Sequence, residues 1–272
     1  MKITPSQKAE FQKVVYSFYT THKRDFPWRN TDDPYCIFVS EIMLQQTQTD
    51  RVIEKYNEFI KNFPNFKTLA KSTFPDVLSV WKGLGYNRRA KWIHECAKTI
   101  EKKHDGILPG KAEELESLPG IGKATARSLL AFAYNKDVLF IETNIRTVYI
   151  HYFFEEKDDI HDNEILELLN QTYDKGHARE WYSALMDYGA FLKKEIGNLN
   201  NRSRHYNKQS KFEGSDRQIR GRLLDILLKE QKITIEDVAG ILKEDTERVQ
   251  RIVRDMVNEK LIKTNKNGML GL

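Results

Sequence analysis

A glycine hairpin at residues 118–123, LPGIGK, constrains the fold of this chain more than any other segment. A helical run, residues 124–133, follows it directly. Two glycines one residue apart permit a tight turn with uncovered backbone amides, and the adjacent helix start favours negative charge. The segment therefore predicts two helices joined by a hairpin that can approach a phosphate closely. The alternative is a plain turn between two packed helices.

Bulk composition limits the class of protein. The 272 residues are 40% hydrophobic and 31% charged, which is typical of a globular chain with two or three folding units. The net charge of +5 is compatible with nucleic-acid binding without being specific for it. No apolar run approaches the ~18 residues of a membrane span, and the N-terminus lacks the apolar core of a signal peptide. We therefore expect a cytoplasmic location and no membrane partner.

Cysteine usage argues against a metal centre. The chain has two cysteines, Cys36 and Cys96, and they are far apart in the sequence. Because a zinc or iron–sulfur site built of four thiolates needs four cysteines, such a site within this chain is excluded. Two buried thiols in a reducing compartment are the favoured interpretation, and no cofactor is expected.

Helical periodicity dominates the first two-thirds of the chain. Thr4 and Pro5 are typical of an N-cap and a first helical residue, and the helix that they open has Phe11 and Val15 on its apolar face. A second helix is predicted from about residue 35 through Gln45 and Gln46. Further helices are predicted at about 52–62, 68–70, 74–81, 87–103, 112–117, 124–133, 144–154, 164–173 and 181–194. Residues 138–141 are a short apolar strand signal in what is otherwise an all-α pattern.

The last quarter of the chain differs in character. Residues 196–216 are polar and basic, and they are predicted to form a linker or a strap packed on the main domain. In residues 217–272, three amphipathic helices precede a hairpin signal at Asn267-Gly268, and three helices with a hairpin describe a winged helix. Its third helix is expected to present four side chains to a DNA groove: Arg248, Gln250, Arg251 and Arg254. A protein-binding or packing module is the alternative.

Three further blocks lie upstream of the glycine hairpin: PWR at 27–29, SEIMLQQTQT at 40–49 and GLGY at 83–86. Together with the hairpin, in this order and spacing, they resemble the helix-hairpin-helix base-excision DNA glycosylases, and within them the MutY-like adenine glycosylases. The resemblance covers about residues 11–194 and leaves out the winged helix. It implies a core at 1–195, with a six-helix domain at about 25–135 and a second helical domain built from 1–24 and 136–195.

The chemistry of such an enzyme needs two carboxylates in different roles. The base is flipped out of the duplex, a general acid protonates the departing adenine, and a second carboxylate stabilises the cationic sugar. Glu41 lies in an apolar stretch that can raise its pKa by desolvation, and the resemblance makes it the catalytic glutamate. A solvated helix glutamate is the alternative.

The second carboxylate departs from the family pattern. After an apolar run the family has an aspartate, a small residue and an asparagine, whereas this chain has Glu142, Thr143 and Asn144. We expect Glu142 to stabilise the developing cation and Asn144 to match the family asparagine. Because misplacement by ~1 Å can cost ~100-fold in rate, a working variant, an altered specificity and an impaired site all stay open.

The resemblance also assigns residues to the base and to the DNA. Those expected at the base pocket and the DNA wedge are Trp28, Arg29, Leu44, Gln46 and Tyr86. Those expected at the DNA backbone are Gly120, Gly122, Lys123 and Thr125. Gln46 matches the wedge that enters the duplex, and Tyr86 matches a residue that stacks next to the opposing base. The alternatives are an exposed helix residue for Gln46, simple packing for Tyr86, and structural roles for Trp28 and Arg29.

Three departures refine the expected activity. Ala124 stands where bifunctional relatives carry a reactive lysine, which implies no strong lyase activity. The cluster cysteines of most relatives are missing after residue 194, and the winged helix replaces the domain that usually reads 8-oxoguanine. We expect a monomer that acts on duplex DNA and excises adenine opposite 8-oxoguanine or guanine. The alternatives are excision of thymine or uracil on the same fold, and a DNA-binding protein without catalysis.

Overall fold

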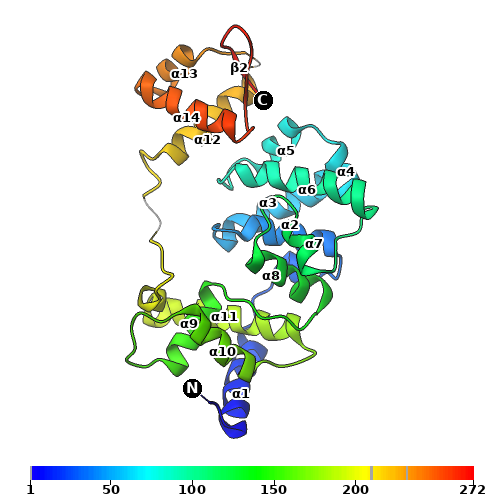
Figure 1. The fold of residues 1–272 in the computed structure, drawn as a ribbon, viewed down its shortest axis with the longest axis vertical. Helices are drawn as coiled ribbons and strands as arrows, with labels where there is room; N and C mark the ends of the chain where they lie inside the picture. Colours follow the sequence, from blue (N-terminus) through cyan, green and yellow to red (C-terminus); the bar gives the residue numbers. More distant parts are fainter. Residues whose placement is uncertain (1, 209–210, 231) are drawn as a thin grey trace. The chain divides into compact units, whose positions relative to one another are not determined.

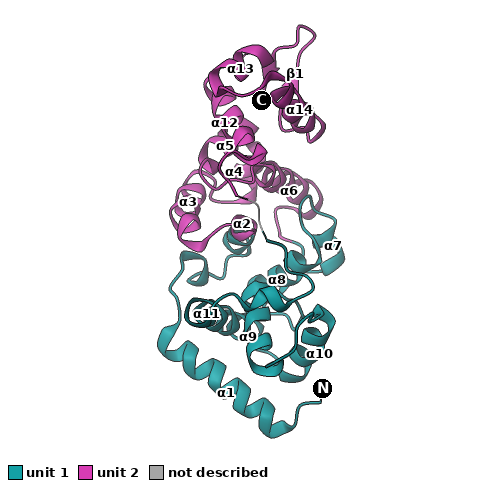
Figure 2. Ribbon diagram, turned by 90° about the vertical axis from the view of Figure 1, so that its left-hand side faces the viewer, with its two compact units in different colours: residues 1–41, 109–208 teal, residues 42–108, 209–272 magenta. Residues whose placement is uncertain are grey.

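The computed structural model describes residues 2–208, 211–230 and 232–272. Within these residues the chain is helical apart from turns, irregular segments and one small hairpin, which confirms the all-α prediction (Figure 1). Two compact units are formed, unit 1 from residues 1–41 and 109–208 and unit 2 from residues 42–108 and 209–272 (Figure 2). These units group the chain differently from the boundaries expected at 24 and 135, and those domain boundaries stay a prediction.

Unit 1 consists of the N-terminal helix, the residues that lead into α2, and the helices between residues 112 and 202. Its elements are α1 (Pro5–His22), η1 (Pro27–Arg29), the first part of α2 (Pro34–Leu44), α7 (Ala112–Glu116), α8 (Lys123–Tyr134), α9 (Thr143–Phe153), α10 (Asp162–Thr172), α11 (Ala178–Ile196) and η2 (Leu199–Arg202). Thr4 caps α1 as predicted, because its side chain accepts from the amide of Gln7 while the Gln7 side chain accepts from the amide of Thr4.

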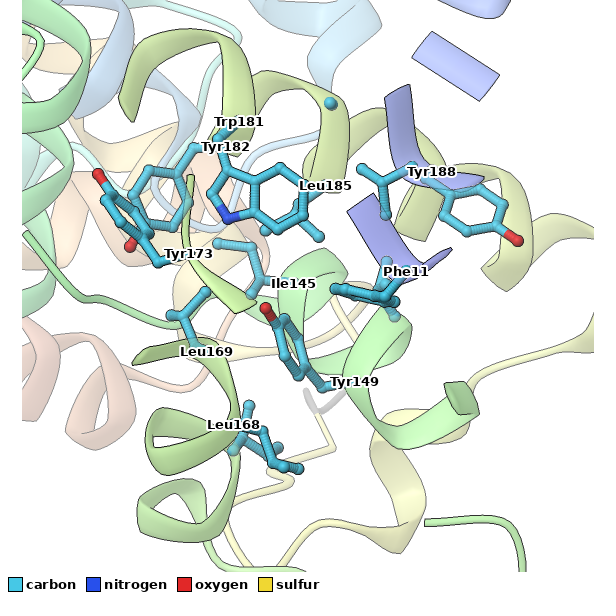
Figure 3. Close-up of a cluster of buried hydrophobic side chains, with 14 of the residues drawn as sticks. Phe11, Ile145, Tyr149, Leu168, Leu169, Tyr173, Trp181, Tyr182, Leu185 and Tyr188 are labelled. Atoms are coloured by element: carbon cyan, nitrogen blue, oxygen red, sulfur yellow. The ribbon is translucent and has the colours of Figure 1, made fainter. Parts of the chain in front are cut away.

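An aromatic core holds α1, α9 and α11 together (Figure 3). The ring of Phe11 lies 5.4 Å from that of Tyr149 and 6.0 Å from that of Trp181, between ring centroids. Such tilted and edge-on pairs add to the free energy gained by burying the rings. The core therefore fixes the position of α9, whose first residues follow Glu142.

The predicted strand at residues 138–141 is absent, and the segment is irregular. Its polar backbone groups bond to a side chain instead of a neighbouring strand. The Tyr182 hydroxyl donates to the Val138 carbonyl at 2.7 Å and accepts from the Phe140 amide at 3.3 Å. The strand prediction was wrong because one tyrosine from α11 satisfies backbone groups that a sheet would otherwise pair.

Unit 2 contains the remaining helices and the hairpin. Its elements are the end of α2, α3 (Thr49–Asn62), α4 (Phe66–Lys71), α5 (Phe74–Trp81), α6 (Arg88–His104), α12 (Asp216–Lys229), α13 (Ile235–Leu242), α14 (Thr246–Asn258), β1 (Lys263–Thr264) and β2 (Leu270–Gly271). The strands pair antiparallel, with Lys263 opposite Gly271. Three helices followed by a hairpin agree with the predicted pattern, and its function as a winged helix stays a prediction.

The C-terminal domain, residues 216–272, contacts α5 and α6 through charged side chains. Glu259 pairs with Arg88 and with Arg220, and its backbone carbonyl accepts from the Lys91 ammonium at 2.9 Å. Asp225 pairs with Lys82 at 3.0 Å. These contacts explain why the C-terminal domain belongs to the same compact unit as residues 42–108. Within the described residues, no helix has the length and apolar character needed to cross a membrane.

Candidate active site

Glu41 lies in α2 and faces α8. The Ser128 hydroxyl on α8 donates to the Glu41 carboxylate at 2.5 Å and also to the Thr125 carbonyl at 3.0 Å. Burial raises the pKa of Glu41 to about 7, and the negative charge of Glu142 acts in the same direction. The Ser128 hydrogen bond and the positive charge of Arg29 oppose this rise in pKa. Glu41 is therefore partly protonated at neutral pH, as a general acid requires.

Glu142 is the N-cap residue of α9. One carboxylate oxygen accepts from the amides of Asn144 at 2.9 Å and Ile145 at 3.0 Å. The other accepts from the Thr143 hydroxyl at 3.1 Å and from the Asn144 side-chain amide at 3.3 Å. Backbone amides at a helix N-terminus are favourable partners for a carboxylate. The longer side chain of glutamate thus reaches the helix start and is held there by four donors.

The start of α9 is set by close packing against α11. Gly189 of α11 is buried, and a Cβ at this position would lie 2.0 Å from the Asn144 carbonyl oxygen and 2.6 Å from its carbonyl carbon. Real Cβ atoms do not approach backbone this closely. Glycine at position 189 therefore lets α11 support the backbone of Asn144, next to the Glu142 cap.

We expect Gly189→Ala to displace the start of α9 and to lower the rate of base excision by about 100-fold, since ~1 Å errors at reacting groups have that effect. Single-turnover excision at a temperature where the variant is folded measures the rate. The matched control is Gly221→Ala on α12, where a Cβ would meet nothing within 4 Å. Equal rates for the Gly189 variant and wild type would refute a positioning role.

The segment after α11 packs on α9. The Asn200 side-chain amide donates to the Thr143 carbonyl at 3.1 Å and to the Thr147 hydroxyl at 2.9 Å. Its oxygen accepts from Arg146 at 3.2 Å, and Arg146 pairs with Asp162 at 2.8 Å. Asn200 therefore ties this segment to the helix that begins at the Glu142 cap. The prediction of a linker or strap at 196–216 stays a prediction, and its residues 209–210 lie outside the described residues.

The residues after α11 do not fit the iron–sulfur cluster that most members of the resembled family hold there. The cysteines, Cys36 and Cys96, lie in α2 and α6, and two thiols are too few for a four-thiolate cluster. In the part of the chain that the structure describes, no group of three or more His, Cys, Asp or Glu side chains is arranged to hold a metal ion. We assign no catalytic step to such a group.

Arg29 and Trp28 are built into the fold of unit 1. Arg29 forms a two-point ion pair with Asp187, at 2.7 and 2.8 Å, and the Asp187 side chain is fully buried. Arg24 pairs with the same carboxylate at 2.7 Å. Trp28 is buried and stacks on Phe26 with centroids 5.0 Å apart. Both residues have a clear structural role, and their role at a base pocket stays a prediction.

The glycine hairpin joins α7 to α8 as predicted. Gly120 has a φ of +74°, and the Ile121 amide donates to the Leu118 carbonyl at 3.2 Å. Gly122 is the N-cap of α8 and makes no side-chain capping bond. Gly122 and Lys123 are exposed and Thr125 is half-buried. The α8 N-terminus thus presents backbone amides with a lysine beside them, which is the arrangement expected for a phosphate contact.

Leu44 ends α2, and Gln46 lies in the turn that follows. The prediction that Gln45 and Gln46 belong to the helix was wrong. Gln46 is exposed and has a φ of +55°, a left-handed conformation that side chains rarely adopt. Such strain persists where the surroundings fix the backbone, and it is common at functional sites.

Arg89 fixes this turn and the GLGY turn together. Its buried guanidinium donates to the carbonyls of Ile42 and Met43 at 2.9 and 2.7 Å, at the end of α2. It also donates to the Thr47 hydroxyl at 2.7 Å and to the Gly85 carbonyl at 3.2 Å. Burial lowers the pKa of Arg89 to about 10, so the group stays charged at neutral pH. One arginine thus satisfies the end of a helix and ties two turns to each other.

The predicted DNA face of α14 is only partly exposed. Gln250 and Arg254 are exposed, whereas Arg248 is half-buried and pairs with Asp216 at 2.9 Å and with Glu244 at 3.0 Å. Arg251 also pairs with Asp216, at 2.9 Å. Arg248 is thus less exposed than predicted, because it pairs with two carboxylates of the same domain. The DNA contact of the four side chains stays a prediction.

Sequence reasoning missed the supporting residues of the site. Ser128, Asp187 and Gly189 support Glu41, Arg29 and Asn144, and Arg89 supports the two turns of unit 2. The only sequence signal for Ser128 was its place directly before the apolar residues 129–133 of α8. Only the fold shows what Gly189 and Arg89 contact.

Known proteins that are similar to this chain in sequence or structure are DNA glycosylases and other base-excision repair proteins. Residues 39–174 match the family described as HhH-GPD superfamily base excision DNA repair protein. An adenine DNA glycosylase of Buchnera aphidicola subsp. Baizongia pistaciae is 37% identical over 186 residues, which cover 67% of this chain and 52% of the relative. An adenine DNA glycosylase of Mycobacterium tuberculosis H37Rv is 31% identical over 280 residues, covering 95% and 92%. The solved structure of a thermostable thymine-DNA glycosylase has a TM-score of 0.62 and 28% identity, covering 68% of this chain and 87% of that one.

Proposed function

Because the chain belongs to the HhH-GPD superfamily of base excision DNA repair proteins, we propose that it is a DNA N-glycosylase that hydrolyses the N-glycosyl bond of a mispaired base. The observation that carries this proposal is Glu41. Its pKa of about 7 makes the carboxyl group a proton donor at neutral pH, and Ser128 fixes its orientation. A solvated helix glutamate would have neither property.

The proposed mechanism divides the work between two carboxyl groups. After the base is flipped from the duplex, Glu41 donates its proton to the base, so that the base departs as a neutral molecule. The bond between the base and C1′ breaks, and the Glu142 carboxylate stabilises the cationic sugar. Water then attacks C1′ and loses a proton, which leaves an abasic site. Ala124 offers no amine for covalent attack, so we propose hydrolysis without strong lyase activity.

Adenine opposite guanine or 8-oxoguanine is the proposed substrate. The support is that adenine DNA glycosylases of two bacteria are 37% and 31% identical to this chain. The sequence Leu44-Gln45-Gln46-Thr47 is typical of the same branch. The exposed hairpin amides supply the proposed contact with the DNA backbone.

Thymine or uracil opposite guanine is the second candidate. The observation that favours it is the structural similarity to a thymine-DNA glycosylase, with a TM-score of 0.62 at 28% identity. The acid Glu41 would serve such a base as well, since the leaving group again departs more easily when protonated.

A panel of duplexes tests these proposals. Each duplex carries adenine, thymine, uracil or hypoxanthine opposite guanine, 8-oxoguanine or cytosine, and strand cleavage is measured on gels with and without alkali. We expect adenine opposite guanine or 8-oxoguanine to be excised fastest, by about tenfold or more over the other bases, a discrimination within reach of a pocket that hydrogen-bonds its base. Cleavage is expected only after alkali, because no lyase step follows.

The controls separate the alternatives. Faster excision of thymine or uracil would replace the adenine proposal. Tight duplex binding without excision of any base would indicate a DNA-binding protein. Borohydride trapping of a covalent adduct by wild type, lost in Lys123→Ala, would overturn the hydrolytic mechanism.

A further inference from the structure

Tyr86 is contacted by two guanidinium groups from different parts of unit 2. The Arg89 guanidinium carbon lies 5.3 Å from the centroid of the Tyr86 ring, and that of Arg217 lies 5.7 Å from it. Arg217 also donates from Nη1 to the Tyr86 hydroxyl at 2.9 Å. Tyr86 itself has a φ of +48°, a strained backbone conformation for a residue with a side chain. Its side chain is held by the two arginines.

Arg217 comes from outside the region that matches the family. It lies in the first turn of α12, whereas the family match ends at residue 174. Arg217 is half-buried, and its guanidinium carbon lies 6.0 Å from the centroid of the Phe212 ring. The C-terminal domain is held on α5 and α6 independently of Arg217, by the pairs of Lys82 with Asp225 and of Arg88 with Glu259. The C-terminal domain thus places the Arg217 guanidinium beside Tyr86, and the two ion pairs hold the domain in that position.

We propose that Arg217 is a specificity-determining residue that sets, with Tyr86, which base is accepted opposite the excised one. The inference rests on the proposed function, because it takes Tyr86 to lie against the opposing base. A guanidinium beside that base favours guanine-type bases, which present the O6 acceptor, over cytosine, which presents an amino donor at the equivalent edge. The C-terminal domain then acts in the site through one side chain.

The test compares opposing bases and leaves the excised base constant. Duplexes carry adenine opposite guanine, 8-oxoguanine or cytosine, and their affinities are measured by fluorescence anisotropy on protein that carries Glu41→Gln, so that no base is removed. In that background we expect Arg217→Ala to lower the ratio of affinities, guanine-type base over cytosine, by about 5-fold or more. Arg217→Lys should lower the ratio as well, because it keeps the charge but loses the planar fork.

Two comparisons give the test its specificity. Asp225→Asn removes a docking contact on the same helix and should leave the ratio unchanged. Tyr86→Phe removes the hydroxyl that Arg217 contacts, and adding Arg217→Ala to it should lower the ratio less than Arg217→Ala does alone. An Arg217→Ala variant that binds all duplexes more weakly by one common factor would overturn the proposal, as would a parent protein that binds all three duplexes equally.

The test of Arg217 and the test of the proposed glycosylase function have separate readouts. Excision by the wild-type protein tests the glycosylase activity, whereas the affinity ratio tests Arg217. A protein that excises adenine with an unchanged ratio in Arg217→Ala refutes the role of Arg217 alone. A protein without excision refutes the glycosylase proposal, and the affinity ratio still decides whether Arg217 selects the opposing base.

Discussion

Replacing Glu41 with glutamine is expected to lower the rate of adenine excision by about 100- to 10,000-fold, the range that a general acid contributes. Glutamine is similar in size and keeps an oxygen that accepts from Ser128, but it has no proton to donate to the base. Single-turnover excision measures the rate, and anisotropy measures duplex affinity, which we expect to change little. A variant with more than a tenth of the wild-type rate would show that Glu41 is not the acid.

The pH dependence of the wild-type excision rate should report the ionisation of Glu41. Because burial raises the pKa of Glu41 to about 7, the protonated acid is lost as the pH rises through that value. The single-turnover rate should therefore fall by about tenfold for each pH unit above about 7. Ser128→Ala is the matched control. Its hydroxyl lowers the pKa of Glu41, so removing it should move the fall in rate to higher pH.

The raised pKa also has a cost in stability. The folded protein holds a proton on Glu41 up to a pH of about 7, whereas the unfolded chain loses it near the ordinary value of 4.5. Ionised Glu41 therefore destabilises the fold increasingly between those two pH values and constantly above them. At pH 8, the free energy of unfolding of Glu41→Gln, measured with urea, should exceed that of wild type by up to about 3 kcal/mol. This difference should shrink towards pH 5.

Local patterns were enough to predict those structural features of the candidate site that depend on neighbours in the sequence, while the functional roles of its residues stay predictions. The hairpin glycines lie between two helices, and Glu41 is embedded in apolar residues of its own helix. The capped start of α1 follows the same rule, since Thr4 and Gln7 are three residues apart. In each of these cases the residues that determine the geometry lie within one or two helical turns.

The parts that could not be predicted depend on contacts between distant segments. Arg89 reaches the end of α2 over more than forty residues, and its contacts place Gln46 in a turn instead of the helix. Tyr182 satisfies the backbone of residues 138–141, which removes the need for a strand partner. Gly189 has no distinguishing neighbours in the sequence, and only the packing of α11 on α9 shows why a side chain is not tolerated there.

The second large effect is expected at Glu142. We expect Glu142→Gln to lower excision by about 100-fold or more, comparable to the loss of one group that stabilises charge in a transition state. The amide side chain still accepts from the α9 amides, but it has no negative charge to place beside the cationic sugar. Single-turnover excision of adenine opposite 8-oxoguanine measures the effect, and a variant with full activity would refute the assignment.

A purely structural role for Glu142 makes a different prediction. If Glu142 acts only as the N-cap of α9, Glu142→Gln can at most weaken the cap, by up to the about 0.5–2 kcal/mol that loss of a whole N-cap costs. Urea unfolding detects such a loss, and the shape of the pH profile does not change. A charge that faces Glu41 has a further signature. Because the negative charge of Glu142 contributes to the raised pKa of Glu41, Glu142→Gln should also move the fall in residual activity to lower pH. An unshifted profile together with a stability loss alone would leave Glu142 as a helix cap.

Glu142→Asp decides among the three alternatives for the longer side chain at position 142: a working variant, an altered base specificity or an impaired site. The four donors around the carboxylate show that glutamate is accommodated at the start of α9, and aspartate is itself a favourable N-cap. We therefore expect Glu142→Asp to keep excision within about tenfold of wild type, because the charge is retained and the shorter carboxylate can still cap the same helix. A large gain in rate would instead mean that the extra methylene impairs the natural site, and a change in the preferred base would mean that it sets specificity.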